Sequence, residues 1–148
     1  MIAVLQRVSR AKVSAKNETI GEIRNGLLIL LGVSKEDSES DAIFLADKIA
    51  GFRIFQDRNE NMNLSIADVN GSILVVSQFT LCADWRKGRR PSFTKAAHPD
   101  DGNRLYKYFI EQLSSKGFHV ETGSFGAMMD VELVNQGPVT FVLDSREK

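Results

Sequence analysis

The chain has 148 residues and is 43% hydrophobic, so it has the size and the apolar content to fold as one domain without crosslinks. Nineteen Lys and Arg residues balance nineteen Asp and Glu residues, which argues against a protein that binds a long nucleic-acid duplex by neutralising many phosphates. A single cysteine, Cys82, excludes an internal disulfide, and the longest apolar run, 27–31, is too short to cross a bilayer, so we expect a cytoplasmic protein without membrane contact.

The first part of the chain predicts an antiparallel meander that leads into a buried strand. Short stretches of strand-forming residues, separated by polar turn residues, predict strands at 2–8, 12–15 and 19–23. The segment 26–33 is nearly all apolar, which is typical of a central strand covered on both faces.

A helix is predicted next, because the acidic, cap-forming segment 36–39 precedes apolar residues at helical spacing. Those apolar residues are Ile43, Ala46, Ile49 and Ala50. The helix should end near Gly51. Residues 52–55 follow as a further strand candidate, and 56–63 form a polar loop rich in Asp and Asn.

An Asn70–Gly71 turn then leads into a predicted strand over 72–81. Pro99 stands at the first position of a second predicted helix, which should stop at Gly117. The apolar face of that helix is formed by Leu105, Tyr108, Phe109 and Leu113.

The last part of the chain, 118–144, reads mostly as strand, with glycine breaks at Gly123, Gly126 and Gly137. Strands outnumber helices, and no composition shift or flexible linker divides the chain. The sequence therefore predicts a single compact α+β domain over residues 1–148, with a mostly antiparallel or mixed, barrel-like β-sheet flanked by two main helices.

Three hydrogen-bonding side chains, Ser77, Gln78 and Thr80, stand at the C-terminal end of an otherwise apolar strand. They either cap turns at a sheet edge or line one wall of a pocket, and the residues alone leave both interpretations open. A Ser or Thr nucleophile would need a neighbouring base, but both histidines, His98 and His119, lie where the pattern favours the surface. Neither lies in a metal-binding pattern, so a metal hydrolase has still weaker support than a catalytic triad.

Three other segments each admit a structural and a functional interpretation. Gly137–Pro138 is either a plain hairpin turn or part of a site, and a cis bond there cannot be assigned from sequence. Phe125, Met128 and Met129 either fill the core or form a slot for a flat base. The basic residues Arg86, Lys87, Arg89 and Arg90 form either a solvated loop or a phosphate-binding loop, and their position after the polar strand end favours phosphate.

Together these motifs resemble the D-aminoacyl-tRNA deacylase family over nearly the whole chain. The matching segments are 7–8 with 11–13, 26–33, 62–65, SQFTL at 77–81, KGRRPSF at 87–93, TGSFGA at 122–127 and GPVT at 137–140. SQFTL, KGRRPSF and GPVT in this order form a highly specific combination. The chain departs from the family pattern at Gln136, where an acidic residue is common, at Cys82, where an aromatic residue is frequent, and at Asn61, where lysine is usual.

The resemblance implies a homodimeric hydrolase that cuts the ester of D-aminoacyl-tRNA, and of glycine mischarged on tRNA(Ala), with no cofactor or metal and no DNA or membrane partner. The catalytic segment would be Ser77, Gln78, Phe79 and Thr80. Backbone amides near Phe79 and Thr80 would stabilise the oxyanion, and Gln78 would orient the ester. The terminal adenosine would lie against Phe125 and Met129, and tRNA phosphates against Arg86, Lys87, Arg89 and Arg90.

The resemblance also implies how chirality is selected. The carbonyls of Gly137 and Pro138, joined by a cis bond in the family and supplied by the other subunit, would occupy the space that an L side chain needs. The 2′-hydroxyl of the tRNA would help to activate water, which agrees with the missing base. Two alternatives stay open: an esterase with Thr80 as nucleophile, and an RNA-binding module without catalysis.

Overall fold

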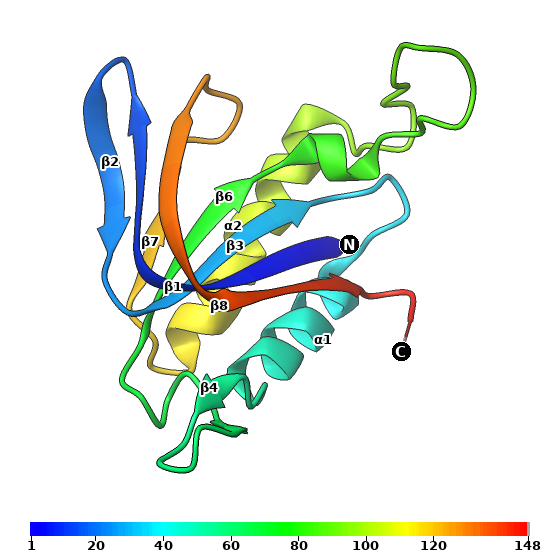
Figure 1. The fold of residues 1–148 in the computed structure, drawn as a ribbon. Coiled ribbons are helices and arrows are strands. Elements are labelled where there is room, and N and C mark those ends of the chain that lie inside the picture. The colour runs from blue at the N-terminus through cyan, green and yellow to red at the C-terminus, as the bar shows by residue number, and fades with distance from the viewer. Residues whose placement is uncertain (148) are drawn as a thin grey trace.

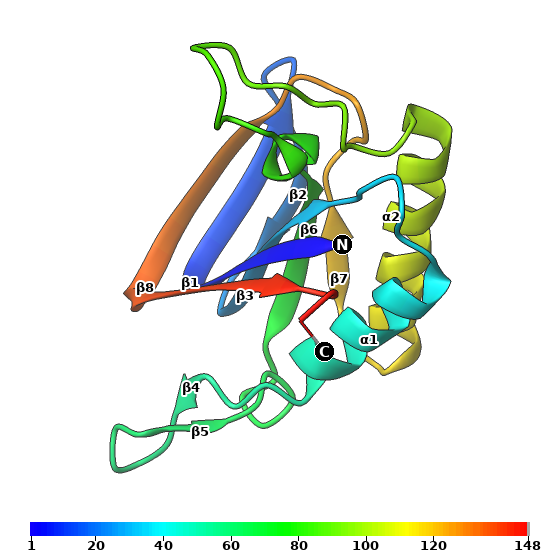
Figure 2. The ribbon, with the colours of Figure 1, turned by 90° about the vertical axis from the view of Figure 1, so that its right-hand side faces the viewer.

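The computed structural model describes residues 1–147 as a curled β-sheet with both long helices packed on one of its faces (Figures 1 and 2). The elements in chain order are β1 (Ile2–Ala15), β2 (Glu18–Ile23), β3 (Gly26–Gly32), α1 (Glu39–Ala50), β4 (Phe55–Gln56), β5 (Met62–Leu64), β6 (Ser72–Ser77), the 3₁₀ turn η1 (Phe79–Cys82), α2 (Pro99–Ser115), β7 (Val120–Thr122) and β8 (Asp130–Asp144). The predicted α+β class, with a mixed, barrel-like sheet and two main helices, is confirmed.

β1 organises the sheet, because it pairs antiparallel with β2, β3 and β8. β6 adds parallel to β3, and β7 adds parallel to β6, so the strand order is β2-β1-β3-β6-β7 with β8 on the other side of β1. β4 and β5 form a separate small hairpin at the lower end of the molecule in Figure 2.

The two strands predicted at 2–8 and 12–15 are one continuous strand, β1. Its register with β8 shifts between Gln6 and Val8 and again between Val8 and Arg10. Before the shifts Leu5 packs in the helix-side core, and after them Ala11 packs in a second core inside the curled sheet. The exposed Ser9 and Arg10 at the shift break the alternation, which is why the sequence pattern indicates two strands.

β3 is covered on both faces, as predicted. Leu27, Ile29 and Leu31 point into the helix-side core, whereas Leu28 belongs to the second core. The second core is formed by Val8, Ala11, Val13, Ile23, Leu28, Leu74 and Val76. Strands from across the sheet contribute to it, so the curl of the sheet is filled by side chains.

Both predicted helices are confirmed close to their predicted limits. α1 begins after Ser38, which forms a reciprocal capping box with Asp41, and ends before Gly51. α2 begins with Pro99 and is followed by Gly117 in a left-handed conformation, with φ +91°. In residues 1–147, no helix is both long and apolar enough to span a membrane.

The strand predictions are too long in three places. The strand predicted at 72–81 ends at Ser77, because the chain turns into η1. Of the strand predicted at 52–55 only Phe55 lies in a strand, β4, which extends to Gln56, and only β7 and β8 of the segment 118–144 are strand. The apolar residues beyond these ends are used in turns and packing contacts instead of in ladders.

Candidate active site

The polar motif lies where the parallel ladder between β3 and β6 stops. The Gln78 amide donates a hydrogen bond to the Leu31 carbonyl at 2.8 Å, and η1 begins at the next residue. A Cβ on Gly32 would lie 2.9 Å from the Leu81 Cβ and 3.0 Å from the Gln78 carbonyl oxygen. Glycine at position 32 therefore allows η1 to lie directly against the end of β3.

Two hollows open on either side of this motif and share Ser77, Gln78, Phe79 and Gly126. The first has a volume of about 290 Å³ and lies under the start of α2. Its other lining residues are Leu31, Val33, Ala96, Ala97, Pro99, Gly102, Tyr106 and Phe125. The second has a volume of about 360 Å³ and is completed by Val76, Ala127, Met128, Met129 and Val131. We call the two hollows together the cleft.

The backbone amides of Phe79 and Thr80 have no hydrogen-bond acceptor among the described residues. They are the first amides of η1, and the first amides of a helical turn have no carbonyl acceptor within that turn. Gln78 donates from Nε2 to Thr80 Oγ1 at 2.5 Å. Thr80 is exposed and does not itself line the cleft, whereas Ser77, Gln78 and Phe79 do.

Phe125 and Met129 lie in different halves of the cleft. The Phe125 ring packs against Tyr106 at a centroid distance of 5.7 Å, and a Cβ on Gly102 would lie 3.3 Å from its ring. The Met129 sulfur lies 3.3 Å from the Ser124 amide, which places it beside the turn that carries Phe125. Met128, by contrast, is 92% exposed, so it does not fill the core.

Tyr106 also lines the cleft, although the apolar face predicted for α2 includes Tyr108, which packs against the core, and not Tyr106. Tyr106 is 3% exposed, and its hydroxyl donates to the Val75 carbonyl at 2.8 Å. Burial raises its pKa to about 12. The pattern contains the signal, because Gly102, Tyr106 and Phe109 follow one helical stripe at spacings of four and three.

Gly137 and Pro138 are exposed and joined by a cis peptide bond. β8 continues on both sides of them, so the glycine break predicted there bends the strand without ending it. Val8 pairs with Asn135 and Gln6 pairs with Thr140, which leaves residues 136–139 opposite the single residue Arg7. These four residues form a bulge, which we call the Gly-Pro bulge.

The Gly-Pro bulge is held from both sides. Arg7 is 5% exposed and donates from Nε to the Gln136 carbonyl at 2.9 Å and from Nη1 to the Ile54 carbonyl at 2.8 Å. Asn135 accepts from the Val139 amide at 2.7 Å and donates to the Val139 carbonyl at 3.2 Å. Because Arg7 binds the backbone of Gln136, this anchor does not depend on the side chain at that position.

The Gly-Pro bulge and the cleft belong to different parts of the sheet. β8 pairs with β1, whereas the cleft lies at the end of β6, and β3 separates β1 from β6. Neither Gly137 nor Pro138 lines either half of the cleft. β8 does reach the cleft near its start, through Val131, but the bulge at 136–139 lies further along the strand. Within one chain the two predicted parts of the site do not come together.

The basic residues 86–90 lie on an exposed loop that starts directly after η1 and projects from the molecule (Figure 1). The loop is closed at its base by two backbone hydrogen bonds of 2.8 Å between Asp84 and Ser92. Arg86 also lines a hollow of about 580 Å³ together with Lys35 and Lys95. The structure thus places a cluster of cations next to the cleft.

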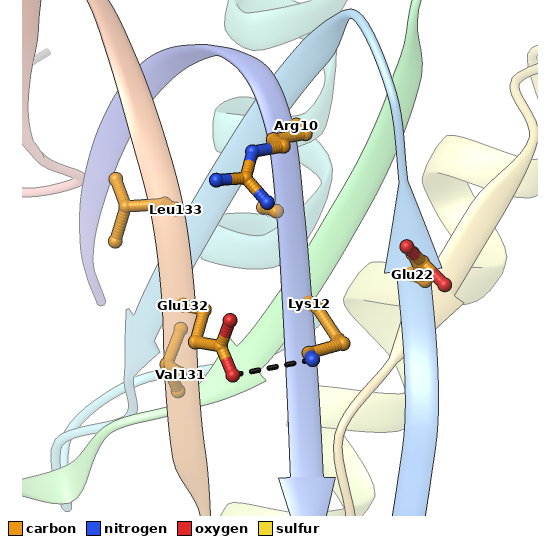
Figure 3. A pocket seen from close by; sticks show the side chains of 7 residues that line it. Arg10, Lys12, Glu22, Val131, Glu132 and Leu133 are labelled. Atoms are coloured by element: carbon orange, nitrogen blue, oxygen red, sulfur yellow. Dashed lines mark ion pairs between the residues drawn. The ribbon is translucent and has the colours of Figure 1, made fainter.

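A further hollow of about 410 Å³ lies on the outer side of β1, β2 and β8 (Figure 3). Lys12 Nζ forms an ion pair with Glu132 at 3.2 Å, and Arg10 and Glu22 lie beside it. Charges of opposite sign alternate there, so it resembles an ordinary solvated sheet face.

The histidines lie outside the cleft. His98 and His119 are exposed, and their nearest carboxylates are Asp100 at 3.9 Å and Glu121 at 3.2 Å. Within residues 1–147, no three His, Cys, Asp or Glu side chains are grouped so that they could hold a metal ion. The cleft therefore offers Thr80 no histidine as a base.

Comparison with known proteins agrees with the motif pattern. A family model described as D-Tyr-tRNA(Tyr) deacylase matches residues 4–144. A Koribacter versatilis protein named D-aminoacyl-tRNA deacylase is 57% identical over 148 residues, covering 100% of this chain and 99% of that protein. A Thermotoga petrophila protein of the same name is 58% identical over 145 residues, covering 98% and 97%.

Two solved structures share the fold. The structure named c-Myc DNA Unwinding Element Binding Protein has a TM-score of 0.91 and 38% identity, covering 97% of this chain and 98% of that one. A probable eukaryotic D-amino acid tRNA deacylase has a TM-score of 0.81 at 18% identity, covering 96% and 97%, and this second likeness speaks for the fold alone.

Replacing Arg7 by Met should lower the free energy of unfolding by about 2–4 kcal/mol, because the carbonyls of Gln136 and Ile54 lose a charged donor while staying partly buried. Urea denaturation measures this change. Arg10→Met is the matched control on the same strand, and it should cost less than about 0.5 kcal/mol because Arg10 is exposed. Equal losses in both variants would contradict the assigned anchor.

Replacing Tyr106 by Phe should cost about 1 kcal/mol at neutral pH, where the Val75 carbonyl loses its donor. In the wild type the pKa is raised from 10.0 to about 12 on folding, so this contribution is complete below pH 10 and is lost as the pH rises towards 12. The difference in the free energy of unfolding between the wild type and Tyr106→Phe should therefore fall by about 1.4 kcal/mol per pH unit in that window. It should change sign before the window ends. Denaturation curves at pH 8 to 12 measure it, and a constant gap would refute the raised pKa.

Proposed function

This chain belongs to the D-Tyr-tRNA(Tyr) deacylase family, and we propose that it hydrolyses the ester bond between a D-amino acid, or glycine, and the 3′ end of tRNA. Glycine mischarged on tRNA(Ala) is included, because a site that excludes L side chains by steric contact has no means to exclude glycine. Such an enzyme proofreads aminoacyl-tRNA, and we place it in the cytoplasm, where its substrate is made.

The observation that carries the proposal is the cleft at the end of β6. It combines the free backbone amide of Phe79, which lines the cleft, and that of the adjacent Thr80 with an apolar slot that contains Phe125. Amides placed in this way suit the oxyanion that forms when water attacks an ester carbonyl, and each donor can supply about 3–4 kcal/mol. The slot suits the flat base of the terminal adenosine, with Phe125 on one side of Gly126 and Met129 on the other.

The attacking water needs a base, and the cleft supplies none. Its one titratable side chain among the described lining residues is Tyr106, whose pKa of about 12 keeps the phenol protonated at neutral pH. Thr80 is hydrogen-bonded to Gln78, and no histidine lies beside it to act as the base that an activated nucleophile needs. We therefore assign water activation to the 2′-hydroxyl of the terminal adenosine, and to Gln78 the orientation of the ester.

We assign chiral selection to the Gly-Pro bulge of a second subunit. Gly137 and Pro138 of the bulge are exposed and held by the bonds of Arg7 and Asn135, yet they do not line the cleft of their own chain. A second copy of the chain can bring it there, so that the carbonyls of Gly137 and Pro138 fill the space of an L side chain. The outer edge of β8 supports such an assembly, since this strand has no partner beyond β1 among the described residues and exposes Val134 and Val142.

The basic loop would bind phosphates of the acceptor end. Arg86, Lys87, Arg89 and Arg90 are all exposed, and none of them appears in an ion pair in the described part of the chain. A localised cluster on a chain with no net charge suits a short stretch of RNA backbone better than a long duplex.

A second candidate function is nucleic-acid binding without catalysis. The name of one solved relative at 38% identity describes DNA binding, and the same slot and loop would serve such a module. This reading predicts that aminoacyl-tRNA is bound and released uncut.

A single-turnover assay separates these mechanisms. We expect D-Tyr-tRNA and Gly-tRNA to be cut, L-Tyr-tRNA to survive, and a 2′-deoxy terminal adenosine to slow hydrolysis at least about 100-fold. Thr80→Ala should retain activity within about tenfold, because only its hydrogen bond to Gln78 is lost. Normal cleavage of the 2′-deoxy substrate with an inactive Thr80→Ala would establish Thr80 as nucleophile, and binding without cleavage would favour the second candidate.

A mixed dimer tests whether the Gly-Pro bulge acts across subunits. Asn135→Ala frees Val139 from its side-chain bonds, so the homodimer of this variant should cut L-Tyr-tRNA. Phe79→Pro removes one amide donor and should inactivate its own cleft. In a dimer of one Asn135→Ala and one Phe79→Pro subunit, purified by two different tags, the active cleft faces the intact bulge of its partner.

That mixed dimer should therefore cut D-Tyr-tRNA at about half the wild-type rate and spare L-Tyr-tRNA. Cleavage of L-Tyr-tRNA by the mixed dimer would mean that each bulge guards its own cleft. If the Asn135→Ala homodimer still rejects the L ester, the bulge has no role in chiral selection. Sedimentation of the wild type should give twice the mass of the 16.5 kDa chain, and a monomer would overturn the dimer outright.

A further inference from the structure

The basic loop carries an exposed tryptophan that the proposed catalytic scheme does not use. Trp85 is the one tryptophan of the chain, and 76% of it is accessible to solvent. Tryptophan is highly buried on average, so this exposure makes Trp85 a candidate contact residue, which its neighbours must support.

The loop that carries Trp85 is anchored at its base. Asp84 and Ser92 exchange two backbone hydrogen bonds of 2.8 Å, and the Asp84 carboxylate accepts from the Arg86 amide at 3.1 Å. Lys95 lies 3.9 Å from the same carboxylate. Trp85 therefore lies at the anchored base of the loop, between Asp84, which closes the loop, and Arg86, its first cation.

The same anchor connects the loop to the cleft. Phe93 follows Ser92 and packs edge-on against Phe79 at a centroid distance of 5.0 Å. Phe79 lines both halves of the cleft. The loop follows η1 directly in Figure 1, and the contact between Phe79 and Phe93 joins its base to the cleft, so a polymer bound in the cleft can continue onto the loop.

The positive charge around Trp85 indicates which kind of polymer the loop can bind. Residues 85–93 contain four cations and no carboxylate. The hollow that Arg86 lines also contains the cations Lys35, Lys95 and Arg146 and one carboxylate, Glu36, so cations predominate there as well. Aromatic side chains set among arginines and lysines bind single-stranded nucleic acid, because bases stack on the ring while phosphates meet the cations.

We propose that Trp85 is a positioning residue that stacks on an unpaired base of the 3′ strand of the tRNA substrate, next to the terminal adenosine held in the cleft. The inference rests on the proposed function, because it takes the polymer in the cleft to be aminoacyl-tRNA. Stacking at Trp85 fixes the direction in which the strand leaves the cleft. It thus adds affinity for tRNA without touching the reacting ester.

Because Trp85 is the one tryptophan, its fluorescence reports directly on stacking. Titration with a single-stranded RNA ending in CCA should quench it, and a blunt RNA duplex should not. Trp85→Ala should weaken binding of a labelled CCA-ended RNA about 5- to 100-fold in anisotropy, and Trp85→Phe should restore most of the affinity. Ile43→Ala, which alters an exposed apolar residue on α1, is the matched control and should bind as the wild type does.

Activity measurements separate this inference from the proposed function. With D-Tyr-tRNA, Trp85→Ala should raise KM with little change in kcat, while hydrolysis of the short ester 3′-O-D-tyrosyl adenosine should equal the wild-type rate. Equal KM values for Trp85→Ala and wild type on D-Tyr-tRNA would overturn the role of Trp85 and leave the proposed function standing. No cleavage of either substrate by the wild type would overturn the proposed function itself.

Two further outcomes count against stacking on RNA. Fluorescence that changes with protein concentration alone would assign Trp85 to contact with a second copy of the chain. Equal loss of activity on the short ester and on tRNA in Trp85→Ala would mean that the residue merely supports the fold of the cleft.

Discussion

The hydrogen bond from the Gln78 amide to the Leu31 carbonyl is the point on which the candidate site depends. It is the last bond along the parallel pair of β3 and β6, and it fixes where the chain leaves the sheet. Gly32 gives η1 the room to lie against the end of β3. Without this close approach Phe79 would not lie at the cleft with its amide unpaired, and the loop that follows would start elsewhere.

The rest of the cleft is built around that fixed end by packing. Tyr106 ties α2 to β6 through the Val75 carbonyl, and Phe125 lies against Tyr106 in the space left by Gly102. The contacts of the buried Tyr106 with Val75 and Phe125 thus hold the polar motif and the apolar slot together. The proposed chemistry needs this rigidity, because oxyanion donors act only when they are positioned before the reaction.

The Gly-Pro bulge is positioned by a separate set of interactions. Arg7 binds backbone carbonyls of two different segments, and Asn135 closes the bulge across Val139. Because these bonds go mostly to backbone atoms, the position of the bulge does not depend on the side chain of Gln136. The cleft and the bulge are therefore two preformed halves of a site, and in our proposal the second subunit joins them.

The sequence by itself determined the two helices, the doubly buried strand β3 and the membership of the family, because caps, apolar periodicity and the order of SQFTL, KGRRPSF and GPVT are local features of the chain. It failed where distant contacts decide. The predicted strand over 72–81 ends at Ser77 since η1 packs on β3, and β1 is one strand since β8 pairs along its whole length. The place of Tyr106 in the cleft and the separation of Gly137 from Ser77 likewise appear only in the tertiary structure, because they depend on how the sheet curls and on which strands it brings together.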